Sequence, residues 1–479
     1  MWLLNTKTFE LKEFFGDKER PQYAILSHTW EKEEVSFAEF QEFRNSDVVI
    51  SGYAQMRSRD PHATFSHYLD YAALKPHRPS IRTPLMEGWS IVDHDPGIES
   101  RQGFLKIKES CRTARELYKS EWIWIDTCCI DKRSSAELSE AINSMFRWYQ
   151  KATRCIAFLV DVDGADTRRQ LKAMEKSRWF TRGWTLQELV APMSISFFTG
   201  DWACIGELSG FDPEPTMANV VTKASGIPVE RLWTWAKRRL SSFPVGQRMS
   251  WVSKRQTTRG EDQAYCLMGL FKVNMPILYG EGARRAFIRL QEEIIKTSSD
   301  QTMFAWHGQL KHCKGDSGLF APFASRFPDT WQMVPVKPKR LEPTVLTNIG
   351  LSIWMRLIPA DAVRRCPASE ASSDSGMRRC NLEDDIGGSP VLDTPVRRVY
   401  GALQCAVRDG EEWKIVTVYL ERRPNSKVFR RITCTQLFLF PPRAFSGRPE
   451  EQILVLEDQQ MSGSEAESIE TSQLSDVLA

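Results

Sequence analysis

Four short apolar runs recur along the first 200 residues, at 23–27, 122–126, 155–160 and 195–198. Each is nearly continuous in hydrophobic residues, which is typical of strands whose two faces are both covered. Helical patterns separate the later runs, and strands that alternate with helices form parallel sheets with right-handed crossovers. The pattern predicts an α/β fold, a mainly parallel sheet with helices on both faces.

The helices between these strands carry their own signals. Apolar positions at Ile107, Cys111, Ala114 and Leu117 recur on one helical face. Ser134 and Glu137 have the spacing of a capping box, in which a hydroxyl and a carboxylate satisfy each other's backbone donors, so a helix is predicted to begin there. Another helix is predicted from Thr185 to the residues before Pro192.

The rest of the chain divides by composition. Residues 44–103 hold five prolines at 61, 76, 79, 84 and 96, which interrupt any period and indicate a surface insertion. Between 214 and 300 the pattern is helical, clearest at 229–240, 261–271 and 284–296. We therefore expect an α/β domain over 1–205, a helical region over 214–300, a β-rich region over 301–460 and a disordered tail over 461–479.

Alternating apolar and polar residues mark the β-rich region. They cover 396–407, 413–420 and 428–439, and Asp409-Gly410 has the composition of a hairpin turn. Residues 369–395 are rich in Ser, Asp and Gly, which predicts a disordered loop. A small antiparallel sheet is the expected structure.

Composition excludes several classes of protein. Hydrophobic residues make up 42% and charged residues 26% of 479, which is typical of a globular chain. The net charge is +3 and no basic run stands out, so nucleic acid is not an expected partner. The amino terminus lacks a signal peptide pattern and no apolar stretch approaches the roughly 20 residues needed to span a membrane. Eleven scattered cysteines indicate reduced thiols and a cytoplasmic location.

Polar side chains follow the predicted strands where each one ends. Ser27, His28 and Trp30 follow the first strand, and Asp126 closes the second. Parallel sheets bind ligands outside the carboxyl ends of their strands. We expect these residues to line one cleft, together with Glu188.

Three stretches resemble the heterokaryon incompatibility (HET) domain of fungi: YAILSHTW at 23–30, WIWIDTCCID at 122–131 and WFTRGWTLQEL at 179–189. Two further segments, RGEDQAYCLMGLF at 259–271 and LYGEG at 278–282, resemble the region that follows this domain in fungal proteins. The resemblance implies a role in allorecognition and innate defence, with programmed cell death triggered when HET domains self-associate or meet an incompatibility partner.

A more distant resemblance points to the TIR (Toll/interleukin receptor) fold, of flavodoxin-like topology. Ser177, Trp179 and Glu188-Leu189 match its Ser-x-Trp and Glu-Leu pairs, although tryptophan and glutamate stand further apart here. The resemblance implies that Glu188 is a catalytic carboxylate of an NAD glycohydrolase, one that stabilises the cationic transition state at the ribose. It further implies that Trp30 or Trp184 stacks on a ring of NAD and that Arg182 holds its pyrophosphate.

Structural roles compete with these assignments. Thr185 and Glu188 also fit a capping box, and Glu188 could pair with Arg182 in the protein interior. The tryptophans could pack in the core, and His28 could simply partner a carboxylate. Cys128 or Cys129 with His28 would make a weak cysteine-hydrolase candidate, because no helix begins near either thiol. NAD is thus a possible substrate; no bound cofactor or metal is expected. The alternative function is a non-enzymatic signalling module that recruits a separate death effector.

Overall fold

The computed structural model describes the chain in segments: residues 1–44, 97–163, 166–209, 215–229, 240–308, 318–337, 342–364, 377–382, 391–392, 395–424 and 426–456. These segments form two compact units. The first comprises Met1–Met174 and Ala191–Gly210, and the second comprises Glu175–Val190 and Phe211–Ala479. The chain thus leaves the first unit at residue 175 and enters it again at residue 191.

A seven-stranded mixed sheet is the centre of the first unit, in the order β2-β1-β4-β3-β5-β6-β7. The four inner strands β4, β3, β5 and β6 are parallel, while β1, β2 and β7 pair antiparallel at the edges. All four apolar runs lie in this sheet, which confirms the predicted α/β architecture. The strands are β1 Trp2–Asn5, β2 Leu11–Glu13, β3 Ala24–His28, β4 Trp122–Trp124, β5 Arg154–Phe158, β6 Ser194–Phe198 and β7 Cys204–Ser209.

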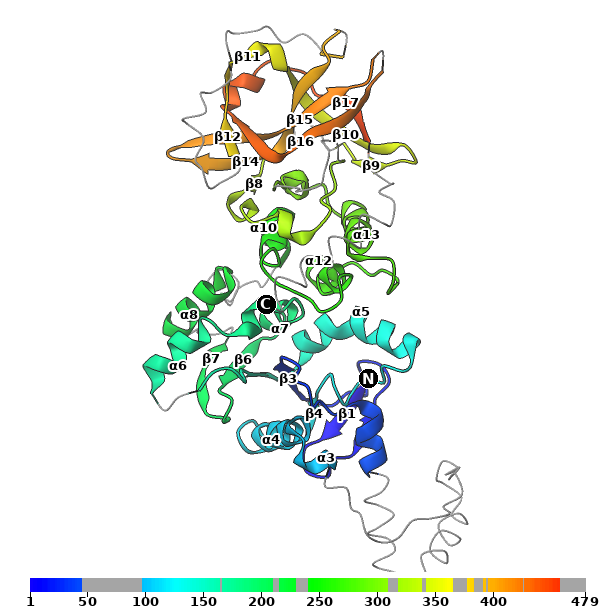
Figure 1. Ribbon diagram of the computed structural model, residues 1–479, viewed down its shortest axis with the longest axis vertical. Helices are drawn as coiled ribbons and strands as arrows, with labels where there is room; N and C mark the ends of the chain where they lie inside the picture. The colour runs from blue at the N-terminus through cyan, green and yellow to red at the C-terminus, as the bar shows by residue number, and fades with distance from the viewer. Residues whose placement is uncertain are drawn as a thin grey trace, which may run out of the picture. The chain divides into compact units, whose positions relative to one another are not determined.

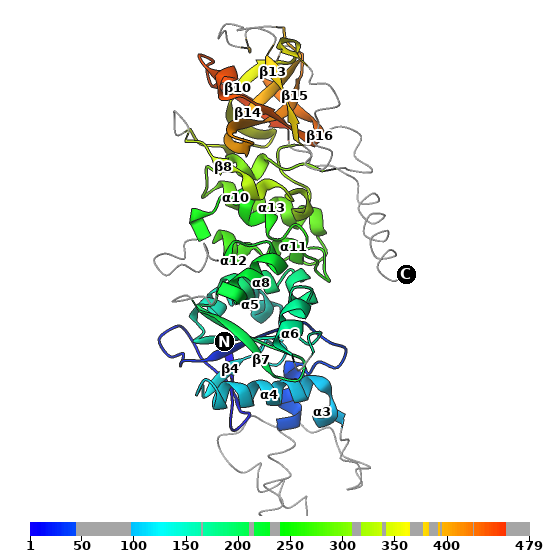
Figure 2. The same cartoon turned by 90° about the vertical axis from the view of Figure 1, so that its left-hand side faces the viewer.

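Helices cover both faces of this sheet. Figure 1 and Figure 2 show α4 (Gln102–Glu116) and α5 (Ser135–Lys151) on opposite sides of β3 and β4. The indole of Trp124 packs against Trp148 and Tyr149 of α5, at ring separations of 5.6 and 5.9 Å. The unit also holds α3 (Gly97–Ser100), α6 (Thr167–Met174) and a helix over 37–44.

The predicted start of α5 is confirmed. Ser134 is the N-cap, and its hydroxyl accepts a hydrogen bond from the backbone N–H of Glu137 at 3.3 Å. The carboxylate of Glu137 accepts from the backbone N–H of Asp131 instead of completing the box at Ser134. The predicted insertion falls mostly on residues 45–96, outside the described residues, and helical structure already begins at Gly97, before the expected end at 103.

Short helices make up the middle of the second unit. The predicted helix at 284–296 is α13 (Ala283–Ile295), but the single helix expected over 261–271 is wrong: two four-residue helices replace it. Most of the helix expected over 229–240 lies outside the described residues. The elements are η1 Arg178–Thr181, α7 Thr185–Val190, α8 Pro215–Ser225, η2 Leu240–Ser242, α10 Val245–Ser250, α11 Asp262–Tyr265, α12 Met268–Phe271, α13, η3 Gln301–Phe304, η4 Ala324–Arg326 and η5 Thr330–Gln332.

The β-rich region is a barrel-like sheet in the order β8-β14-β15-β16-β17-β10-β9, closed by a further pairing of β14 with β10 (Figure 1). Strands β14 and β15 form the predicted hairpin, in which Gly410 takes a φ of 63° between Asp409 and Glu412. The elements are β8 Val334–Pro335, β9 Val345–Leu346, β10 Gly350–Pro359, η6 Ala360–Ala362, β11 Val363–Arg364, β12 Met377–Arg379, β13 Asn381–Leu382, β14 Arg398–Asp409, β15 Glu412–Arg422, β16 Val428–Phe440, η8 Pro442–Phe445 and β17 Glu451–Leu456.

Most of the loop expected at 369–395 and all of the expected tail at 461–479 lie outside the described residues. Across the described segments, every helix is too short or too polar to cross a lipid bilayer.

Candidate functional site

His28 and Asp126 meet at the carboxyl end of the parallel strands of the first unit. His28 is the last residue of β3, and Asp126 follows β4 by two residues. The imidazole Nε2 of His28 lies 2.8 Å from Oδ1 of Asp126, and the indole N–H of Trp30 donates to Oδ2 at 2.8 Å. Three of the four residues predicted to line a cleft in this unit are therefore in direct contact. Ser27 differs, since it is fully buried within β3.

Ionised Asp126 is favoured by these contacts. Burial raises the pKa of Asp126, but the charge and hydrogen bond of His28, the charge of Lys132 and the hydrogen bond of Trp30 outweigh it and hold the pKa well below the ordinary value. Lys132 lies over the Trp30 ring, 3.6 Å from its centroid, in a cation–π contact.

A second carboxylate lies behind His28. Glu34 Oε1 is 3.8 Å from His28 Nδ1 and forms an ion pair with Lys106, whose side chain is only 6% exposed. Within the described part of the chain, His28 Nδ1 and Glu34 Oε2 are buried without a hydrogen-bond partner. The cluster therefore joins two acids, two lysines and an imidazole, a set that can bind a polar ligand or move a proton. No sequence pattern indicated Glu34 or Lys106, because neither lies at a strand end.

The other predicted site residues belong to the second unit. Glu188 lies in the first turn of α7, where it is 7% exposed. Arg182 donates to the hydroxyl of Thr258 at 3.2 Å, and Trp184 donates its indole N–H to Asp262 Oδ2 at 3.1 Å. A cleft that Glu188 shares with Ser27, His28 and Asp126 remains a prediction.

The capping box considered for Glu188 is wrong. Thr185 is the first residue of α7, and its hydroxyl donates to the carbonyls of Trp179 and Arg182. That hydroxyl is also an acceptor for Arg255, at 3.0 Å from Nη1. Thr185 therefore fixes the approach to the helix through tertiary contacts and does not cap it through Glu188.

Arg255 is a buried cation whose charge interacts with that of Glu188. No sequence pattern pointed to it. Burial lowers the pKa of Arg255 to about 10, against the opposing influence of the charges of Cys266 and Glu188. Its guanidinium also donates to the carbonyls of Trp251 and Arg182, at 3.1 and 2.9 Å. Among the described residues, Arg255 Nη2 and Gln187 Nε2 are buried donors without a partner.

Asp262 joins three of the sequence stretches that carry the resemblance. Its Oδ2 accepts from Trp184, and its Oδ1 accepts from the hydroxyl of Tyr279 at 3.0 Å. Burial raises the pKa of Asp262, although these two hydrogen bonds act in the opposite direction. Next to it, the carboxylate of Glu261 accepts the backbone N–H groups of Gly280 and Gly282, at 2.8 and 3.2 Å. The stretches at 179–189, 259–271 and 278–282 thus form one hydrogen-bonded arrangement.

The adjacent cysteines are not nucleophiles in this fold. Cys128 and Cys129 are both buried, and burial raises the pKa of the Cys128 thiol. A thiol that resists ionisation is a poor nucleophile. Within the described residues no group of His, Cys, Asp and Glu side chains has the arrangement of a metal site.

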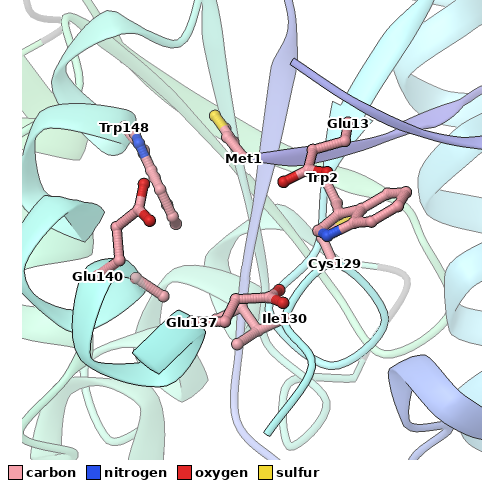
Figure 3. A pocket seen from close by; sticks show the side chains of 9 residues that line it. Met1, Trp2, Glu13, Cys129, Ile130, Glu137, Glu140 and Trp148 are labelled. Atoms are coloured by element: carbon pink, nitrogen blue, oxygen red, sulfur yellow. The ribbon is translucent and has the colours of Figure 1, made fainter. Parts of the chain in front are cut away.

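A small depression in the first unit is lined by Cys129 but by none of the other candidate site residues. Figure 3 shows it between β1 and α5, with Trp2, Glu13 and Glu137 among the side chains that line it. Its volume of about 30 Å³ holds a water-sized molecule, which is too little for a nucleotide.

Comparison with known proteins places these residues in context. Residues 93–167 match the family described as heterokaryon incompatibility protein (HET), and residues 285–342 match a domain of unknown function, DUF8212. Over 283 residues, 58% of this chain, the sequence is 38% identical to vegetative incompatibility protein HET-E-1 of Podospora anserina. The matched segment spans 16% of that relative. No solved structure matches the chain.

Proposed function

We propose that the protein acts in fungal vegetative incompatibility, because residues 93–167 match the heterokaryon incompatibility (HET) family and the chain is similar to HET-E-1. The similarity to HET-E-1 supports this role for the shared segment, which is a small part of that relative. We place the protein in the cytoplasm. The cysteines that the structure describes are free thiols, which is compatible with a reducing compartment.

The proposed mechanism is programmed cell death triggered when HET domains associate, with each other or with an incompatibility partner. One observation supports it above the others: Trp30 is 48% exposed, yet its indole is fixed by Asp126 and Lys132. A large aromatic side chain held rigid at the surface loses little entropy on binding, and tryptophan is enriched among residues that dominate interfaces.

Trp30→Ala tests this proposal in the full chain. We expect association, measured by sedimentation velocity, to weaken at least about tenfold, with a parallel loss of toxicity when the variant is expressed in a fungal cell. Trp413→Ala is the matched control, because Trp413 is equally exposed, at 48%, in the second unit. Unchanged association of the Trp30 variant, or an equal loss in the Trp413 variant, would reject the proposal.

Hydrolysis of NAD by a TIR-like site at Glu188 is the second candidate. The two unpartnered buried donors near Glu188, Arg255 Nη2 and Gln187 Nε2, favour a ligand that carries acceptor oxygens. In this proposal Glu188 stabilises the cationic transition state, while Trp184 and Arg182 of the same unit contact the substrate. Burial of Glu188 weighs against it, since a dinucleotide has to reach the carboxylate.

NAD loss with purified full-length protein at self-associating concentrations tests the enzyme directly. Glu188→Gln should lower cleavage by about 100-fold or more, because the amide carries no charge, whereas Glu188→Asp should retain part of it. Melting curves show whether the variants fold. Absence of NAD loss in the native protein would remove the enzyme proposal and leave the association proposal standing.

A further inference from the structure

Three arginines surround one carboxylate on the barrel-like sheet. Glu421 lies on β15, directly opposite Arg398 of β14 and Arg430 of β16. Its Oε1 is 3.2 Å from Nε of Arg398 and 3.0 Å from Nε of Arg397, and its Oε2 is 3.1 Å from Nε of Arg430. We refer to these four residues as the arginine cluster.

The charges in the arginine cluster do not balance. Three guanidinium groups contact the single carboxylate of Glu421, so the cluster itself carries an excess of positive charge. Like charges on neighbouring strand positions destabilise a sheet. If the arginines only neutralised Glu421, a sheet with one of them would therefore be more stable than a sheet with three.

Burial differs sharply between the carboxylate and the guanidinium groups. The Glu421 side chain is 5% exposed, whereas those of Arg397, Arg398 and Arg430 are 71%, 54% and 41% exposed. The hydrogen bonds from Arg430 and Arg398 and the charge of Arg397 lower the pKa of Glu421 against the effect of burial. Glu421 thus stays ionised beneath the arginines and orients them.

The terminal nitrogens remain available for a ligand. Arg397 and Arg398 contact Glu421 through Nε, and in the described part of the chain their Nη groups have no partner. A guanidinium held at Nε presents its Nη donors in a fixed direction, which is the geometry that binds phosphate oxygens. On the same sheet face, the adjacent rings of Tyr400 and Tyr419 are tilted against each other, with their centroids 4.7 Å apart.

We propose that the arginine cluster is a binding site for a phosphomonoester group. A phosphomonoester carries close to two negative charges and three terminal oxygens, which match the excess positive charge of the cluster and the N–H donors of Arg397 and Arg398. A phosphodiester chain carries one charge per phosphate and would call for a longer basic stripe. The group can belong to a phosphorylated side chain of a protein or to a small phosphorylated molecule.

Fluorescence anisotropy with the full chain tests the site. The probe is a fluorescein-labelled peptide with one phosphoserine among glycine and alanine residues, and its unphosphorylated form is the reference. We expect the phosphate to strengthen binding at least about tenfold. Glycerol phosphate should compete for the site, whereas dimethyl phosphate should not.

Substitutions assign the effect to the cluster. Arg397→Gln with Arg398→Gln should weaken binding of the phosphopeptide about tenfold or more. Arg378→Gln with Arg408→Gln removes the same charge from two exposed arginines of the same sheet and should change binding less than about twofold. If the glutamine pair does not fold, Arg397→Lys with Arg398→Lys keeps the charge but loses the planar fork and should still weaken binding.

The competitors distinguish the two sources. Peptide binding that is much tighter than that of glycerol phosphate indicates a phosphorylated protein, and equal binding indicates a small phosphorylated molecule. The proposal fails if the unphosphorylated peptide binds as well, if the control pair weakens binding equally, or if a single-stranded oligonucleotide without terminal phosphate competes better than glycerol phosphate.

Discussion

The imidazole of His28 and the carboxylate of Asp126 lie 2.8 Å apart across 98 positions of sequence, at adjacent parallel strands. The contact places a buried histidine against a carboxylate that also holds the exposed indole of Trp30. It is the centre of the polar cluster in the first unit, and several of its consequences can be measured.

Asp126→Asn should lower the free energy of unfolding at pH 7 by about 1–3 kcal/mol, because hydrogen bonds to a charged acceptor are replaced by weaker ones. The folded-state pKa of Asp126 lies below its ordinary value of 3.8, so its stabilisation is present above pH 4 and is lost on acidification below it. Urea unfolding at pH 7 and pH 3 measures both effects. Asp126→Asn should lose less stability between pH 7 and pH 3 than the native protein does. The exposed control, Asp163→Asn, should lose as much as the native protein.

Lys106→Met should destabilise the first unit by about 3 kcal/mol, because it leaves the carboxylate of Glu34 without its buried counter-charge. The double variant Lys106→Met with Glu34→Gln removes both charges and should recover part of the loss. Chemical denaturation of the single and double variants gives the coupling. Additive losses would show that the two side chains do not act as a pair.

Asp262→Ala should destabilise the second unit by about 2–4 kcal/mol, because the donors of Trp184 and Tyr279 both lose their acceptor. Asp262→Asn keeps an acceptor for one of them and should lose less. Asp361→Ala, at an exposed position of the same unit, is the control and should change stability by less than about 0.5 kcal/mol. Thermal unfolding followed by tryptophan fluorescence provides the measurement, and equal effects of the two alanine variants would contradict the prediction.

Cys204 should react with iodoacetamide in the folded protein well before Cys128 does. Cys204 is exposed, whereas Cys128 is buried with a pKa raised by that burial. Mass spectrometry of peptides after timed alkylation, with a urea-unfolded sample as reference, ranks the two sites. Early labelling of Cys128 would reopen the cysteine-hydrolase alternative.

Local pattern was enough to predict the elements of the first unit. Continuous apolar runs identified the four inner strands, since only a strand covered on both faces tolerates them, and Ser134 with Glu137 marked the start of α5. The alternation of strand and helix predicted the parallel sheet and the strand-end position of His28 and Asp126. These features depend on residues that are close in sequence, so local patterns are enough to predict them.

The partners of the polar side chains depend on the tertiary structure. Glu34 and Lys106 belong to segments that no periodicity relates, and Arg255 reaches Thr185 and the region of Glu188 from 70 residues away. The helix expected over 261–271 divides into two at Cys266 and Leu267, and in the first piece Asp262 and Tyr265 form hydrogen bonds with Tyr279 and Glu281. A polar side chain can cap a helix, pair with a charge or face a ligand. Long-range packing determines which of these it does, because packing places the other residues next to it.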